Sequence, residues 1–179
     1  MIKITAQPVA EPVSVDFVKD YLHWLDTDAG TENIISYYIT AAREEIEKHT
    51  NLSLVEKTYS QWVKESNMMD LKIDLFYPPH YEIVKVVKIS DSGEETTKTR
   101  GSGYTLYEGK RYTIKFDDSG FYRVDFKSGY GDEYGQALPA LLKMAIAEQV
   151  GNWYEGHTEV GELSKSVIAK VGKYSMNLL

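Results

Sequence analysis

Residues 122–131 read YRVDFKSGYG. Three large apolar side chains, Tyr122, Val124 and Phe126, alternate with charged side chains, which is typical of a strand with one buried face. The glycines on either side of Tyr130 indicate that the chain turns there. The stretch therefore predicts the closing strand of a sheet.

The same two-residue period runs back through the middle of the chain. Apolar residues alternate with polar ones over residues 71–75 and 112–116, and Ile83, Val87 and Ile89 continue the two-residue period. Residues 91–93 and 108–109 are Asp-Ser-Gly and Glu-Gly, which are typical turns between such strands. We therefore expect a small antiparallel sheet over residues 55–131.

Helical patterns lie on both sides of this sheet. After an extended arm at residues 1–13, Ser14 can cap a first helix and Thr31 a second, longer one. These two helices form a hairpin over residues 14–54, because neither would be stable alone. Residues 132–179 form a C-terminal segment, in which a helix precedes a weakly amphipathic tail.

Proline suits the first turn of a helix, so we expect the C-terminal helix to begin near Pro139. Gly151 lies inside it, at a cost of about 1 kcal/mol relative to alanine, which predicts close packing against a neighbouring backbone. Together these patterns predict a single domain, residues 1–179, of the α+β class. It would be a small helical bundle, made of the N-terminal helix hairpin and the C-terminal helix, with an inserted antiparallel β-sheet.

The composition restricts the class of protein. The 179 residues contain no cysteine, so neither a disulfide nor a thiolate metal site can stabilise the fold. The formal net charge of −7 repels phosphate groups on average, which argues against broad DNA binding. No apolar run approaches the ~18 residues of a membrane span, and the first residues lack the apolar core of a signal peptide. We expect no contact with a membrane.

Three stretches of the chain carry a resemblance to a known family. They are residues 13–15 before the first helix, residues 39–51 at the end of the second, and residues 122–155. The last combines the strand and its Gly-Tyr-Gly turn with a Leu-Pro helix start and a Trp-Tyr-Glu helix end. In this order they resemble the head–tail connector (head-completion or adaptor) family of tailed phages. The tyrosine-rich insert between Tyr77 and Gly120 departs from the family pattern, as does the tail after Gly156.

The resemblance implies a structural virion protein and no enzyme. Its subunits would form a homo-oligomeric ring in the virion neck, below the portal protein, after synthesis in the host cytoplasm. The ring would extend the DNA channel and dock a downstream connector or tail protein, while DNA passes through without specific binding. The family carries no catalytic residues and no cofactor.

A closed ring requires two different contact patches on each subunit. Exposed aromatic and apolar side chains are frequent anchors of such patches. The candidate interface residues are Trp62, Tyr104, Tyr107, Tyr112, Tyr130, Tyr134, Tyr154, Tyr174, Leu178 and Leu179.

A second hypothesis is a carbohydrate- or nucleic-acid-binding β-module. It uses Tyr104, Tyr107 and Tyr112 as a stacking platform, because aromatic rings beside cations can bind bases or sugars. The cations of this cluster are Arg100, Lys110 and Arg111. Cross-strand pairing of tyrosines explains the same residues equally simply.

A third hypothesis is a small hydrolase that uses Glu155, His157 and Glu159. Catalytic acids and bases are usually held in a buried pocket, whereas these residues follow a helix end between glycines, so we expect a solvated loop. Residues 26–32 resemble the start of a calcium loop, but the motif needs its glycine one position after Gly30 and a bidentate glutamate further on. We therefore expect an acidic turn between two helices and no metal site.

Overall fold

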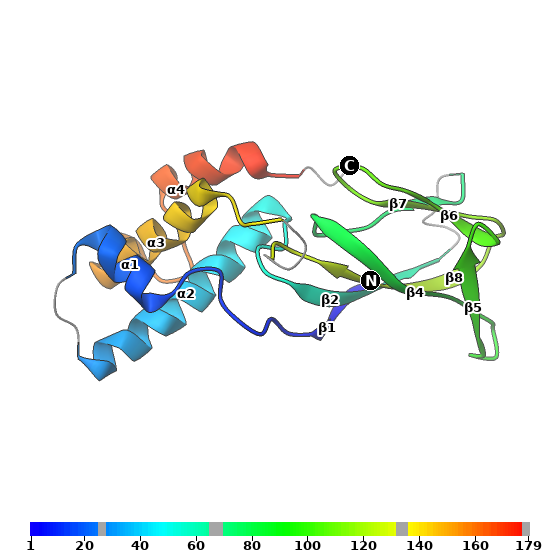
Figure 1. Cartoon of the computed structure of the whole chain (residues 1–179), viewed down its shortest axis with the longest axis horizontal. Helices are drawn as coiled ribbons and strands as arrows, with labels where there is room; N and C mark the ends of the chain where they lie inside the picture. Colours follow the sequence, from blue (N-terminus) through cyan, green and yellow to red (C-terminus); the bar gives the residue numbers. More distant parts are fainter. Residues whose placement is uncertain (25–27, 65–69, 132–135, 177–179) are drawn as a thin grey trace. The chain divides into compact units, whose positions relative to one another are not determined.

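A computed structural model describes residues 1–24, 28–64, 70–131 and 136–176 of the chain. The chain divides into two compact units (Figure 1). The β unit consists of Met1–Pro8 and Val55–Tyr130, and the helical unit of Val9–Leu54 and Gly131–Leu179.

In the described part of the β unit, eight strands form one sheet, in the order β1-β2-β8-β4-β5-β6-β7-β3. Neighbouring strands are antiparallel except β5 and β6, which pair in parallel over two residues each. The strands are β1 (Ile2–Ala6), β2 (Lys57–Val63), β3 (Lys72–Asp74), β4 (His80–Ile89), β5 (Glu95–Arg100), β6 (Gly103–Tyr107), β7 (Thr113–Phe116) and β8 (Phe121–Ser128).

The two-residue period of β8 creates the core of the β unit. Tyr122, Val124 and Phe126 are fully buried, as the alternation predicts. They pack with apolar side chains of β2, β3, β4, β6 and β7 in one cluster. The amide of Gln61 on β2 is buried in the same unit, where it donates to Asp74 O and accepts from Phe76 N, both at 3.1 Å. This side chain therefore satisfies backbone groups on the outer side of the edge strand β3.

The expected fold class, a small helical bundle with an inserted antiparallel sheet, is wrong. The chain is rich in β-structure, and its mixed eight-stranded sheet has a core of its own. Two long-range or irregular pairings cause the difference. Ile2–Ala6 forms the edge strand β1 by pairing with β2, which lies more than fifty residues further along the chain. Thr99 and Arg100 pair in parallel with Gly103 and Tyr104 across a tight turn.

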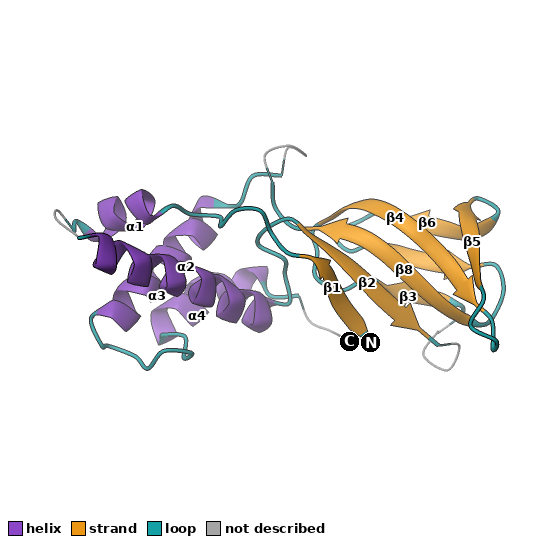
Figure 2. Cartoon of the chain, turned by 90° about the horizontal axis from the view of Figure 1, so that it is seen from below, coloured by secondary structure: helices purple, strands orange, loops and turns teal. Residues whose placement is uncertain are grey.

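The described part of the helical unit contains four α-helices, drawn in purple in Figure 2. They are α1 (Val15–Leu22), α2 (Ala29–Thr50), α3 (Ala140–Tyr154) and α4 (Lys165–Val171), and the 3₁₀ turn η3 (Gly172–Tyr174) follows α4. Helix α3 packs against each of the other three. It is buried on several sides because its sequence is apolar almost all round.

Local sequence signals set the helix ends. Ser14 caps α1 by accepting a hydrogen bond from Phe17 N at 3.0 Å, which confirms the prediction. The cap of α2 is Asp28 and not Thr31, since the Asp28 carboxylate accepts from Thr31 N at 2.8 Å. Hydrogen bonds from Thr31 to the Asp28 carboxylate favour its charged form and lower its pKa. The acidic turn thus supplies a helix cap; residues 26 and 27 lie outside the described part of the chain.

Gly151 packs closely against a neighbouring helix, but the contact is with a side chain and not with the backbone that we predicted. A Cβ atom on Gly151 of α3 would lie 2.9 Å from Leu22 Cδ2 of α1. The missing side chain lets α1 approach α3 closely. None of the described helices is both long enough and apolar enough to span a membrane.

Candidate interaction surfaces

The structure does not bring the three tyrosines of the predicted stacking platform onto one surface. Tyr104 on β6 is only 7% exposed and belongs to the core, and burial raises the pKa of its hydroxyl. Tyr112 packs against the same core. Tyr107 is 49% exposed, and it lies three positions after Tyr104 on one strand. Side chains an odd number of residues apart point to opposite faces of a strand, so the platform is not formed.

Tyr112 instead helps to enclose a buried histidine. Its ring stacks on His80 with 5.2 Å between centroids, and its backbone N–H donates to His80 Nδ1 at 3.2 Å. His80 Nε2 lies 3.0 Å from Phe76 O, so the hydrogen-bond pattern assigns the proton of the neutral ring to Nε2. Burial lowers the pKa of His80 to about 4. Tyr112 and His80 therefore support the fold of the β unit.

Tyr107 lies on an exposed face formed by β6, β7 and β3. Lys72 on β3 places its ammonium 6.0 Å from the centroid of the Tyr107 ring. Lys115 on β7 is directly opposite Lys72 in the strand register, and both lysines are exposed. We call Lys72, Tyr107 and Lys115 the lysine–tyrosine patch. It is a polar surface with one aromatic ring.

The outer face of β8 and its neighbours carries paired charges. Arg123 binds Glu95 of β5 through both terminal guanidinium nitrogens and lies 3.2 Å from Asp125. Trp62 pairs with Arg123 in the strand register and is half-buried. This face therefore compensates its own charges, and the role of Trp62 in an interface stays a prediction.

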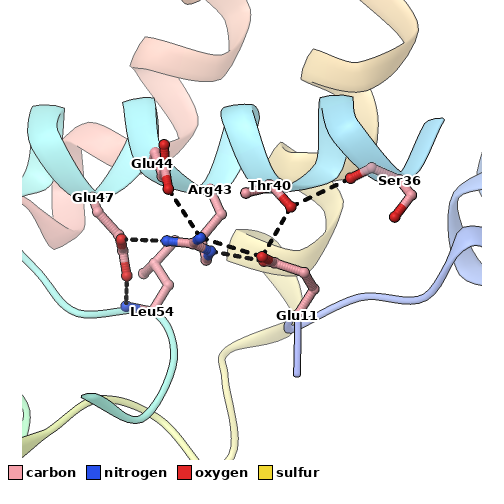
Figure 3. Close-up of polar contacts among 7 residues, drawn as sticks. All are labelled: Glu11, Ser36, Thr40, Arg43, Glu44, Glu47 and Leu54. Carbon is pink, nitrogen blue, oxygen red and sulfur yellow. Dashed lines mark hydrogen bonds and ion pairs between the residues drawn. The ribbon is translucent and has the colours of Figure 1, made fainter. Parts of the chain in front are cut away.

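An internal ion network anchors the segment before α1 to α2 (Figure 3). Arg43 is only 3% exposed and binds Glu11 through two hydrogen bonds, of 2.7 and 3.2 Å. Its third nitrogen donates to Glu47 at 2.8 Å, and the other Glu47 oxygen accepts from Leu54 N at 2.8 Å. Burial opposes the charge of Arg43, but the Glu11 and Glu47 carboxylates outweigh it and raise the pKa. The network is structural, because the buried Arg43 joins the Glu11 segment and Glu47 within the helical unit.

The residues of the hydrolase hypothesis lie in solvent. His157 is 63% exposed, and its Nδ1 lies 3.5 Å from the exposed Glu155 carboxylate. The loop that follows is held by Gln149, whose amide donates to Glu162 O and accepts from Ser164 N. Within the described residues no group of three metal-ligating side chains is present. These residues do not form a pre-organised acid–base site.

The remaining predicted interface residues differ in their surroundings. Tyr154 at the end of α3 is exposed, and its ring lies 4.5 Å from that of Trp24. Tyr130 and Tyr174 are half-buried, and Lys173 lies over the Tyr174 ring. Tyr134, Leu178 and Leu179 lie outside the described residues. The role of all these residues in an interface stays a prediction.

Sequence reasoning missed an exposed apolar pair on α2. Tyr37 is 76% exposed, and Ile34, one turn before it, is also exposed. The buried stripe of α2 contains Ile35, Ile39 and Ile46. Ile34 and Tyr37 lie outside that stripe, so a helical wheel of residues 29–50 contains the signal that identifies them.

Comparison with known proteins identifies the fold. No protein-family model matches the sequence, and no curated protein matches it. The chain is similar to a chain in the neck of an empty GTA particle computed with C6 symmetry, with a TM-score of 0.77 and 18% identity. It is also similar to a chain in the virion of a native gene transfer agent (GTA) particle, with a TM-score of 0.79 and 19% identity. A third similar chain is from the neck of a native GTA particle computed with C12 symmetry, with a TM-score of 0.75 and 19% identity.

Each alignment covers 100% of this chain and 97% of the other chain. The alignments therefore span both units. At these identities the likeness shows a shared fold.

Proposed function

We propose that the chain is a structural subunit of the neck of a phage or phage-like particle, where it forms a homo-oligomeric ring. The observation that carries the proposal is the full-length match to chains from necks that were computed with cyclic symmetry. The family resemblance of residues 13–155 supports the same role. The finer assignment is a head–tail connector below the portal, which extends the DNA channel and docks the next connector or tail protein.

The surfaces of the chain suit a role in assembly. The predicted acid–base residues lie in solvent, whereas Tyr37, Ile34 and Tyr154 expose apolar area that a partner can bury. Ring closure needs two different patches per subunit, and the two units supply chemically different surfaces. The protein thus acts through shape and association.

Electron microscopy of the purified full-length chain tests the proposal, alone and mixed with the portal protein of the same particle. Native mass spectrometry of the same samples gives the subunit number. We expect closed rings that bind coaxially to the portal. A chain that stays monomeric at high concentration, and that also fails to bind the portal, would contradict the proposal. Rings that form without binding the portal would refute only the position below it.

A further inference from the structure

The two units of the chain differ strongly in charge. The β unit has 13 Lys and Arg against 12 Asp and Glu, a formal charge of +1. The helical unit has 7 against 15, a formal charge of −8. The net charge of −7 therefore belongs to the helical unit, and the β unit is close to neutral.

The lysine–tyrosine patch concentrates positive charge on the β unit. Lys72 and Lys115 are cross-strand neighbours, a position in which like charges destabilise a sheet. Among the described residues, neither lysine has a carboxylate within 4.0 Å. Within the single chain, Lys72 interacts with the Tyr107 ring, but no described carboxylate compensates either lysine.

Helix α1 carries a pair of negative charges. Asp16 and Asp20 are four residues apart, so both carboxylates lie on one face of the helix, and both are exposed. The nearby Lys19 binds Glu32 at 2.8 Å, and no described basic group pairs with either aspartate. Asp16 interacts favourably with the N-terminal dipole of α1, but Asp20 lies in the last turn, where a negative charge is unfavourable.

The distance between the two lysines is similar to the distance between the two aspartates. Cβ atoms of cross-strand neighbours are about 4.5–5.5 Å apart, and those of residues four apart on a helix about 5–6 Å. Two lysines can therefore face two aspartates simultaneously. Within each unit the two like charges of a pair repel one another, and this repulsion is offset when a lysine pair faces an aspartate pair.

We propose that Lys72 and Lys115 of one copy bind Asp16 and Asp20 of the next copy in the ring. This inference rests on the proposed function and names one of its interfaces. The interface is heterologous, as a ring requires, because it joins the β unit of one subunit to the helical unit of another. Tyr107 lies beside Lys72 and packs at the edge of the same contact.

A second copy fits this patch better than nucleic acid does. Binding of DNA relies on an extended surface of cations. The face of the patch also carries Asp74, which pairs with Arg111, and the adjoining turn carries Glu108, which pairs with Arg100. Two isolated lysines instead match a pair of carboxylates.

Charge reversal tests the interface. The variant Lys72→Glu/Lys115→Glu and the variant Asp16→Lys/Asp20→Lys each place like charges across the contact, so each alone should lose association. Mixing the two variants restores opposite charges at every contact, and a chain that carries all four substitutions does the same. Sedimentation velocity and electron microscopy of each variant, of the mixture and of the fourfold variant measure ring formation. We expect at least a tenfold weaker association for each variant and recovery in both combinations.

Matched controls change the same charge elsewhere on the same unit. Lys3→Glu/Lys64→Glu and Glu159→Lys/Glu162→Lys alter exposed side chains and should leave association within about twofold of wild type. Circular dichroism verifies that every variant is folded.

The outcomes separate this inference from the proposed function. Wild-type rings that persist in both reversal variants would overturn the interface and leave the ring proposal standing. Failure of the mixture and of the fourfold variant to recover would overturn it as well. Loss of binding to labelled duplex DNA in Lys72→Glu/Lys115→Glu, with rings unchanged, would assign the patch to nucleic acid. A wild-type chain that never associates overturns both proposals.

Discussion

Replacing Gly129 with alanine should destabilise the β unit more than any other glycine-to-alanine change in that unit. Gly129 follows β8 with φ of +128°, and its N–H donates to Pro79 O at 2.8 Å. A Cβ atom there would lie 2.0 Å from Val55 O and 2.4 Å from Val55 C. No rotamer change can relieve this contact, because both neighbouring atoms belong to the backbone. The peptide at residues 55–56 or the turn itself must therefore move.

Two contributions set the size of the effect. A positive φ costs a non-glycine residue about 1–2 kcal/mol, and forcing an additional atom into packed structure costs about 1–3 kcal/mol. We expect Gly129→Ala to lower the free energy of unfolding by about 2–5 kcal/mol, a large share of the 5–15 kcal/mol of an ordinary domain. Gly93→Ala isolates the first contribution. Its φ is +86° and no atom lies within 4 Å of its Cβ position, so it should cost only about 1–2 kcal/mol.

Urea unfolding, followed by circular dichroism and by tryptophan fluorescence, measures both variants against wild type. A Gly129→Ala variant whose loss of stability is no greater than that of Gly93→Ala would refute the reasoning. Such a result would mean that the turn does not hold residues 55 and 129 in contact.

Two further predictions concern buried charge. The pKa of His80 is about 4 in the folded chain and about 6.5 in an unfolded one, so stability is fully present above pH 6.5 and is lost as the pH falls towards 4. The loss should reach about 3 kcal/mol, and urea unfolding from pH 7.5 to 4 should show it in wild type but not in His80→Gln. Arg43→Ala removes the buried cation that binds the Glu11 and Glu47 carboxylates and should cost about 3–5 kcal/mol. Thermal unfolding should show a much smaller effect for Lys48→Ala, whose side chain is exposed on the same helix, and equal effects would argue against the network.

Local periodicity predicted the elements better than it predicted their pairing. The strand at residues 121–128, the cap at Ser14 and the helix end at Thr50 all follow from side chains within a few residues of each other. The pairing of β1 with β2 depends on side chains in the finished sheet, and the alternation of Ile2 and Ile4 is too short a pattern to predict it. The parallel step between β5 and β6 depends on a turn whose glycines at 101 and 103 have positive φ. A sheet assembled from such contacts is larger than its local patterns indicate.

The surface residues were also hard to predict, because their grouping depends on strand pairing. Tyr104 and Tyr107 are three residues apart, so a strict two-residue period already places them on opposite faces of a strand. Grouping tyrosines by their closeness in sequence ignored that geometry. The cross-strand neighbours Lys72 and Lys115 are 43 positions apart, and only the register of β3 with β7 reveals them. Side chains that meet through pairing of distant strands cannot be found from spacing along the chain.

The division of charge also changes the argument about DNA. A net charge of −7 favours a channel wall along which DNA slides, but only the helical unit carries that excess. A channel lined by the β unit would present Lys72 and Lys115 to the phosphates and would slow the DNA. In the proposed interface each lysine pair is matched by the aspartates of the next copy, so ring closure itself removes the exposed cations. If the lysines lie in the interface, Lys72→Glu/Lys115→Glu should impair ring assembly. If they line the channel wall instead, rings should still form, and the variant should change the passage of DNA through them.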